Sequence, residues 1–467
     1  MFVLLVAAES ALAQSPDPIT AAPGVGLRGA MQDSALLGGV PSGEATDDVI
    51  RLSLDDAINR GLKFNLGILL GRENVVYAEG ARGRAKAELL PSLSMNTYQM
   101  REQINLAALG FGGFPGIPAI IGPFDVFDTR LYLKQPILDL KARNAARSEA
   151  SNLAAVQHSF KDTRDLVVLI CGNLYLDAVA GQTRIEAARA QLQTAQALYD
   201  LAVDRKKAGL AAGIDELRAR VQLQSQQQRM IVAENDFAKQ KLTLARAIGL
   251  PVGQKYALTD EIPYVPLTGV TQDDALVQAY QNRGDYLSAQ ERVRAAELER
   301  KAVGSERIPK LDFDADYGII GSRVNVSHGT FSVAANLRFP IFDGGKIHSR
   351  EIEADAVLRQ RQAAVDDLRA RIHYEIQSTF LDLRAADERV HVAQSSLDLA
   401  KEEIRQVQDR FSAGVATSVE VVQSQEALAN ASENYISSLY TFNASKAALA
   451  RSMGVAEDAY QKFLRGK

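Results

Sequence analysis

The chain has 467 residues, of which 46% are hydrophobic and 24% are charged, with 53 lysines and arginines against 57 aspartates and glutamates. The resulting net charge of -4 lacks the basic excess that binds nucleic acid, so we expect no DNA or RNA partner. The single Cys171 excludes an intramolecular disulfide framework, and the five histidines form no HExxH motif or close cluster. We therefore predict no metal site.

The N-terminal residues predict the compartment. Phe2 to Ala8 form a short apolar run, and Ala11-Leu-Ala13 before Gln14 is a cleavage pattern of the secretory type, although the usual basic segment is missing. We predict a truncated signal peptide at 1–13, with a disordered apolar tail as the alternative. Residues 14–51 include a stretch rich in proline, glycine and serine and predict a flexible N-terminal segment. No cysteine follows the cleavage site to carry a lipid anchor.

Residues 52–455 contain two copies of one unit. Four motifs recur in the same order: Asp-Asp-Ala at 55 and 273, Pro-x-Leu at 91 and 309, Pro-Ile-[Leu/Phe]-Asp at 136 and 340, and Leu-Ala-Arg-x-x-Gly at 244 and 449. Ordered matches of this kind indicate a duplication. We place repeat 1 at 52–265, repeat 2 at 266–455 and a C-terminal tail at 456–467. The first copy is longer between Pro91 and Pro136, where Gly110 to Pro118 predicts an extended loop.

Each copy begins with a predicted helix, at 55–90 and 273–308, that ends before a proline. After the strands come two proline-free stretches, 140–208 and 344–413, each long enough for roughly 100 Å of helix at about 1.5 Å per residue. Shorter helices are predicted at 214–249 and 419–454. Because two short helices laid end to end match one long helix, we expect each long helix to lie beside two collinear short ones.

The strands between these helices alternate in polarity, most clearly in the second copy. One face carries apolar residues, namely Leu311, Phe313, Ala315, Tyr317 and Ile319, followed on the returning strand by Phe331, Val333, Ala335, Leu337, Phe339 and Ile341. The other face carries Asp312, Asp314, Asp316 and Arg338. Strict alternation disfavours a calcium loop, which needs a turn with a glycine and a distal glutamate.

Two strands per copy offer no second layer that could bury the apolar face. A closed barrel with lipid outside and water inside satisfies both faces and places Asp312, Asp314, Asp316 and Arg338 in the lumen. Because the chain has no tryptophan, we expect the aromatic belt at the membrane interface to use Tyr98, Tyr132, Tyr317 and nearby phenylalanines.

The duplicated order of helix, two strands, long helix, turn and helix, with Pro-Ile-[Leu/Phe]-Asp at each strand exit and Leu-Ala-Arg-x-x-Gly at each repeat end, resembles the TolC family of outer membrane efflux proteins. The resemblance covers roughly 52–455. It implies a mainly α fold with a small β part. The duplicated long helices would form an α-barrel tunnel, and each protomer would add four strands to a trimeric twelve-stranded outer membrane β-barrel.

The resemblance also implies a function. The chain would be the passive exit duct of a tripartite efflux pump or a type I secretion system, in the outer membrane of a Gram-negative bacterium, with a large periplasmic portion. Its implied partners are two further copies of itself, outer membrane lipid, a periplasmic adaptor (membrane fusion protein) and an inner-membrane RND, ABC or MFS transporter. The transporter would supply the energy and select the drug, metal, siderophore or protein to be exported.

The family's periplasmic tips correspond to residues 205–215, the first tip, and 410–420, the second tip. Gly209 and Gly414 are expected to adopt the left-handed conformation of a helix reversal, and the adaptor would contact Gly209, Leu210, Gly414 and Val415. The predicted lining and gate of the entrance consist of Asp215, Glu420, Gln423, Arg205, Arg410 and Phe411. Asp215 and Ser418 lie near helix starts, so capping is an alternative role for both, while Asp215 and Glu420 would otherwise form acidic rings.

The second tip departs from the family at Phe411 and Ala416, where members often place a gate-locking tyrosine and arginine. Phenylalanine cannot donate a hydrogen bond, so we expect Arg205 or Arg410 to pair with Asp215 instead. An enzyme is disfavoured because GxSxG, GxxxxGK[ST] and GxGxxG motifs are absent, and we predict no catalytic residues and no cofactor. The remaining alternative is a periplasmic coiled-coil scaffold protein without a channel.

Overall fold

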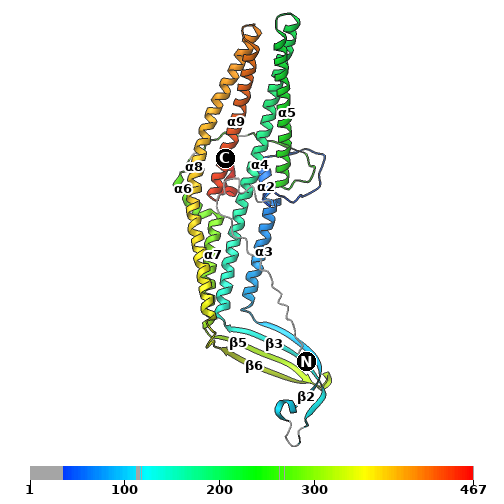
Figure 1. The fold of residues 1–467 in the computed structure, drawn as a ribbon. Helices are drawn as coiled ribbons and strands as arrows, with labels where there is room; N and C mark the ends of the chain where they lie inside the picture. The colour runs from blue at the N-terminus through cyan, green and yellow to red at the C-terminus, as the bar shows by residue number, and fades with distance from the viewer. Residues whose placement is uncertain (1–34, 112–115, 117, 262, 268, 466–467) are drawn as a thin grey trace, which may run out of the picture.

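The computed structural model describes residues 35–111, 116, 118–261, 263–267 and 269–465. The predicted signal peptide at 1–13 lies outside the described residues, as do residues 14–34 of the N-terminal segment. The molecule is elongated, with a four-stranded sheet at one end and two helical hairpins at the other (Figure 1). Short helices and a small sheet surround its middle.

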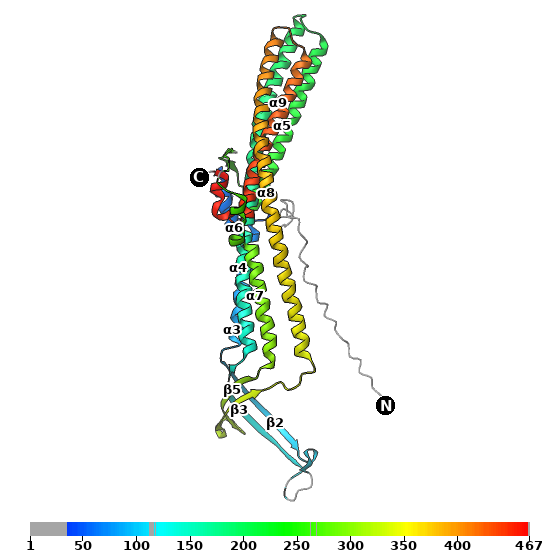
Figure 2. The same ribbon diagram turned by 90° about the vertical axis from the view of Figure 1, so that its left-hand side faces the viewer.

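Two long helices run along the molecule, α4 (Leu140–Lys207) and α8 (Lys346–Ser412). Along α4 lie α3 (Leu66–Ala87) and α5 (Gly213–Ala247), and along α8 lie α7 (Gly284–Gly304) and α9 (Ser418–Ser452). Figure 2 shows each short helix covering a different part of its long neighbour. The prediction that two collinear short helices accompany each long one is confirmed.

The first helix of each copy is not continuous, so the predicted single helices at 55–90 and 273–308 are wrong. In the first copy α2 (Leu54–Phe64) ends at Asn65, where α3 begins, and in the second α6 (Gln272–Asn282) ends at Arg283, where α7 begins. Both junction residues have extended backbones, with ψ of 137° and 118°. The side chain of Asn65 donates to the carbonyls of Leu36 and Ala247, and that of Arg283 donates to the carbonyl of Ser452.

These junction contacts are tertiary, which is why helical periodicity did not reveal the breaks. Asn65 is fully buried and Arg283 is 3% exposed, and Arg283 also forms ion pairs with Asp285 and Glu375. A buried arginine requires partners of this kind, because an unpaired charge is costly to remove from water. Each copy is therefore fastened at its middle by one polar residue that also contacts the end of that copy's last helix.

The middle of the molecule is more ordered than the sequence predicted. Leu36 is buried in the main core, and β1 (Ile50–Leu52) pairs in parallel with β4 (Tyr256–Leu258), so two parts of the described stretch 35–51 contact the body of the molecule, while Val40 and Val49 between them are exposed. The tail expected at 456–467 contains α10 (Ala456–Arg465), whose Phe463 is buried in the same core. Burial of its apolar face stabilises this helix. The repeat boundaries remain a prediction.

The sheet has the strand order β2 (Ser92–Asn105), β3 (Ile120–Leu138), β5 (Lys310–Gly321) and β6 (His328–Arg338), and all neighbours are antiparallel. Strand β6 ends at Arg338, so the predicted apolar positions Phe339 and Ile341 lie beyond it. The loop after β2 begins with a helical turn, Ala107–Phe111, and parts of it lie outside the described residues. Two further short turns, Ser305–Arg307 and Val324–Val326, flank β5.

Among the described residues, α4 is the one helix long and apolar enough to cross a membrane. The apolar stretch responsible is 78% buried inside the molecule, where Val167, Cys171 and Ala178 have no exposed surface. This stretch is therefore part of the main core, in which it is joined by residues of α2, α6 and α10.

Candidate functional site

Both helical hairpins reverse through the same hydrogen-bonded turn. In the first tip the amides of Gly209 and Leu210 donate to the carbonyls of Lys206 and Arg205, and φ of Gly209 is 71°. In the second tip Gly414, with φ of 80°, takes the place of Gly209. This pattern is the Schellman motif, which requires a left-handed residue after the helix. The predicted conformation of both glycines is confirmed.

An apolar residue follows each of these glycines and is open to solvent. Leu210 is 76% exposed and Val415 is 67% exposed. In a Schellman motif this residue usually packs against the helix three positions before its cap, but those positions here are Arg205 and Arg410. The two turns lie at the extreme end of the molecule (Figure 1), and their apolar side chains are left available to a partner.

The returning helix of the second hairpin, α9, starts with a capping box. The Thr417 hydroxyl accepts from the Glu420 amide at 3.3 Å, and the Glu420 carboxylate accepts from the Thr417 amide at 3.0 Å. The amide and hydroxyl of Thr417, together with the nearby Arg410 guanidinium at 3.5 Å, hold the pKa of Glu420 below its usual range. Glu420 therefore remains an anion at any pH near neutrality. The residue that caps this helix is Thr417, so a capping role for Ser418 is wrong.

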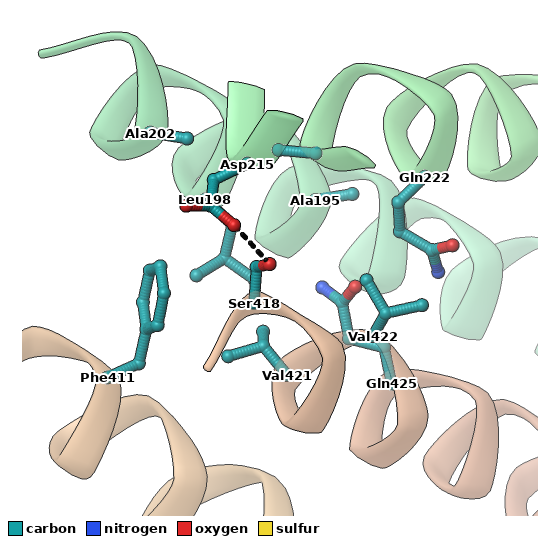
Figure 3. A pocket seen from close by; sticks show the side chains of 11 residues that line it. Ala195, Leu198, Ala202, Asp215, Gln222, Phe411, Ser418, Val421, Val422 and Gln425 are labelled. Carbon is teal, nitrogen blue, oxygen red and sulfur yellow. Dashed lines mark hydrogen bonds between the residues drawn. The ribbon is translucent and has the colours of Figure 1, made fainter. Parts of the chain in front are cut away.

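Asp215 links the two tips instead of capping its own helix. The N-cap residue of α5 is Ala212, and no side chain caps this helix by a hydrogen bond. Asp215 Oδ1 instead accepts from the Ser418 hydroxyl at 2.7 Å. Figure 3 shows this bond crossing from one hairpin to the other. The capping alternative for Asp215 is therefore wrong, and its carboxylate is one of the contacts between the hairpins.

Arg205 makes the second link between the tips, and its partner is not the predicted one. The guanidinium donates to the backbone carbonyl of Phe411 at 2.8 Å and stacks over the Phe411 ring, with 5.0 Å to the ring centroid. Arg410 pairs with Glu420 within its own hairpin. Neither guanidinium pairs with Asp215 within one chain, because both are occupied by residues of the second tip, and a pairing between copies stays a prediction.

The Phe411 ring lies between the two tips. It is 9% exposed and lies beside Leu198 and Val421, around a cavity of about 20 Å³, which is room for roughly one water (Figure 3). A tyrosine hydroxyl is absent here, but the backbone carbonyl of the same residue accepts the link from Arg205. The second tip therefore keeps a contact to the first despite its departure from the family pattern. Gln423 is exposed, one turn beyond Glu420.

The sheet at the other end has one apolar and one polar face. The strand register aligns Met95, Leu131, Tyr317 and Phe331 on one face, and these side chains are between 42% and 77% exposed. Side chains of a strand alternate between its two faces, so a residue an odd number of positions from this row lies on the opposite face. This applies to all four predicted lumen residues, Asp312, Asp314 and Asp316 on the strand of Tyr317 and Arg338 on the strand of Phe331. The alternation predicted for the second copy is thus present in β5 and β6, and the apolar row continues across β3 and β2 through Leu131 and Met95.

The polar face also carries a charged network that our sequence analysis missed. Arg130 pairs with Asp316 and Asp128 and donates to the Thr330 hydroxyl at 2.9 Å, which joins β3, β5 and β6. The alternating run from Phe127 to Leu133 contained the signal, because Asp128 and Arg130 occupy its polar positions. The register also places Tyr98 and Tyr132 on this face, so their predicted place in a lipid-facing belt beside Tyr317 is wrong.

The sequence matches the model of the family described as outer membrane efflux protein over residues 74–250 and 275–455. It is 26% identical over 393 residues to the pyoverdine export outer membrane protein OpmQ of Pseudomonas aeruginosa. This alignment covers 80% of this chain and 79% of that protein. It is 20% identical over 342 residues to the alkaline protease secretion protein AprF of the same organism, with 72% and 71% covered.

Solved structures show the same fold. The CmeC outer membrane channel of Campylobacter jejuni superposes with a TM-score of 0.77 at 16% identity, covering 92% of this chain and 94% of that one. The outer membrane protein VceC of Vibrio cholerae gives a TM-score of 0.74 at 18% identity, with 86% and 96% covered. Both halves of the molecule, the sheet and the helical hairpins, are included in this agreement.

Proposed function

The chain belongs to the family of outer membrane efflux proteins, and we propose from this premise that it is the passive exit duct of a tripartite efflux pump or a type I secretion system. The observation that carries the proposal is the pairing of a two-faced sheet with two long helical hairpins in one chain. The exposed apolar face of the sheet suits lipid, and the polar face suits a water-filled lumen. In a soluble periplasmic scaffold that apolar face would be exposed to water, which is unfavourable for so large an apolar surface.

A homotrimer would complete the barrel. Strands β2 and β6 are the two edges of the four-stranded sheet, and an edge strand presents unpaired amides and carbonyls. No such edge is tolerated in lipid, so each edge would pair with the sheet of another copy. Three copies would give the twelve strands expected for this family, and the long helices would continue the lumen across the periplasm of a Gram-negative cell.

Acidic side chains at the tips would select cations at the entrance. Glu420 is ionised near neutral pH and its side chain is 38% exposed, and threefold symmetry would repeat it around the axis. A ring of fixed carboxylates attracts cations into a pore. Asp215, which is less exposed because it accepts from Ser418, would contribute a second ring, and Gln423 a polar but uncharged one. The network around Arg130, Asp128 and Asp316 would line the barrel lumen.

Replacing Glu420 by glutamine should weaken block of the single-channel current by multivalent cations by about tenfold, because each ring loses its charge while the Thr417 amide keeps an acceptor. Recordings from planar bilayers measure this.

In the native protein the block should persist below pH 4.5, since the pKa of Glu420 is lowered. Gln423→Glu serves as the matched opposite change and should strengthen block. Identical blocking curves for Glu420→Gln and the native channel would remove Glu420 from the lining.

The exposed apolar residues of the tips would dock the periplasmic adaptor, beyond which an inner-membrane RND, ABC or MFS transporter would supply the energy. Leu210 and Val415 project from the two turns next to Gly209 and Gly414. Such isolated apolar side chains at the end of a hairpin suit burial in a partner, and each would contribute roughly 1.5 to 3 kcal/mol when fully covered.

The double variant Leu210→Asp, Val415→Asp should therefore abolish export in cells while the channel still assembles, because two charges would have to be buried against the adaptor. Drug or metabolite efflux and adaptor cross-linking measure the effect. Val252→Asp is the matched control, since Val252 is 87% exposed in a loop at the middle of the molecule. Normal export by the double variant at normal protein levels would refute docking through these residues.

A further inference from the structure

A cavity of about 450 Å³ lies between the two hairpins, on the sheet side of the tips. Its walls come from α4, α5, α8 and α9, and its apolar lining includes Leu397, Ile404, Leu428 and Ile436. This volume is within the range of sites that hold small organic ligands. The cavity adjoins the small space around Phe411 through the shared Gln425, but none of the tip residues that the proposed function uses lines it.

The side-chain oxygen of one buried amide in the cavity wall has no partner among the described residues. Gln226 is 2% exposed, and no hydrogen bond to its side-chain oxygen is formed by any residue that the structure describes. The two threonines of the wall cannot serve it, because Thr183 and Thr194 donate to the carbonyls of Val179 and Ala190 in their own helix. A buried amide without a partner costs free energy, so this position favours a ligand that donates a hydrogen bond or brings a water with it.

One charged side chain borders the cavity. Lys401 is the single ionisable group with formal charge among the lining residues, and it forms no ion pair with any described carboxylate. The acidic residues near it on its own helix have other partners, with Asp398 accepting from Gln394 and lying near Tyr435 of the lining, and Glu402 paired with Arg405. A cation at the rim of an apolar cavity, with no carboxylate in the lining, favours an anionic ligand.

We propose that this cavity is a binding site for amphipathic carboxylates. The apolar body would lie against Leu397, Ile404 and Leu428, the carboxylate would pair with Lys401, and a polar group or bound water of the ligand would satisfy Gln226. The site goes beyond the proposed duct function, because binding here requires neither conduction nor an adaptor. A ligand in this position contacts both hairpins at once and would hold them at a fixed spacing.

The absence of tryptophan from the chain allows a direct measurement. Tyr435 lines the cavity, so Tyr435→Trp places a unique fluorophore in its wall. The full-length protein in lipid nanodiscs would be titrated with 4-(4-bromophenyl)butanoate, whose bromine quenches tryptophan, and with the amine of the same aryl body. Tyr374→Trp, at a residue of α8 that is 70% exposed and does not line the cavity, reports non-specific partitioning into lipid.

We expect saturable quenching of Tyr435→Trp by the carboxylate, with at least fivefold tighter binding than the amine. Adding Lys401→Gln should abolish that preference, and adding Ala190→Phe, which fills the cavity from α4, should remove saturable quenching by both probes. Linear quenching equal to that of Tyr374→Trp, equal affinity for the two probes, or unchanged carboxylate binding in either added variant would each overturn the proposal. Failure of the channel in bilayers would leave these titrations unaffected, so the two proposals are tested separately.

Discussion

Alanine at Gly454 should strongly destabilise the fold, and this is the largest loss of stability from a single substitution that we expect. Gly454 ends α9 with φ of 70°, and a Cβ atom there would lie 2.6 Å from the backbone nitrogen of Arg283 and 2.7 Å from its Cα. Backbone atoms cannot retreat as a flexible side chain can, so the α6–α7 junction would have to shift. We expect a loss of roughly 3 kcal/mol or more beyond the cost of the positive φ.

Gly209→Ala is the matched control for that cost. Gly209 has almost the same φ, 71°, but a Cβ atom there would meet nothing within 4 Å. Its alanine variant should lose only about 1 to 2 kcal/mol, the cost of a left-handed conformation. Thermal unfolding of the purified proteins, followed by circular dichroism, compares the two. Equal stability of Gly454→Ala and Gly209→Ala would show that the contact with Arg283 does not constrain the fold.

Alanine at Arg205 should open the periplasmic end, and we expect the single-channel conductance to rise several-fold. The guanidinium holds both the Phe411 carbonyl, at 2.8 Å, and the face of its ring. Removing it leaves the Asp215–Ser418 hydrogen bond as the main polar link between the tips. Arg205→Lys should give an intermediate conductance, because lysine keeps the charge but lacks the planar group that both bonds and stacks.

Arg220→Ala separates the loss of the link from the loss of a positive charge. Arg220 is an exposed arginine of the same hairpin, on α5, for which no hydrogen bond or ion pair is found among the described residues. Its alanine variant should conduct like the native channel. Equal conductance of Arg205→Ala and Arg220→Ala in the same bilayers would show that the Arg205 contact does not restrain the entrance.

Periodicity and motif repeats were sufficient to predict the long helices, the turns at Gly209 and Gly414, and the two-faced strands. These features depend on local rules, namely the absence of proline, the need for a left-handed glycine and the alternation of side chains along a strand. The same repeats predicted the pairing of long with short helices. Family membership rests on the comparison, which agrees with the resemblance inferred from the motifs.

The contacts between distant segments could not be predicted in this way. The breaks at Asn65 and Arg283 depend on the carbonyls of Ala247 and Ser452, which lie far away in sequence. The Leu-Ala-Arg-x-x-Gly motif at each repeat end contained a hint, because its glycines, Gly249 and Gly454, both have positive φ and contact these junctions closely. At the tips, Arg205 donates to a backbone carbonyl. Because every residue has such a carbonyl, the residue types in the sequence could not reveal this partner.

The central claim is that this chain forms a trimeric duct in the outer membrane, and fractionation of expressing cells tests it most directly. We predict that the protein sediments with the outer membrane and migrates on an unheated gel as a trimer that boiling converts to monomer, because each barrel edge needs another copy. A soluble monomer released with the periplasmic fraction would contradict the duct and favour the coiled-coil scaffold.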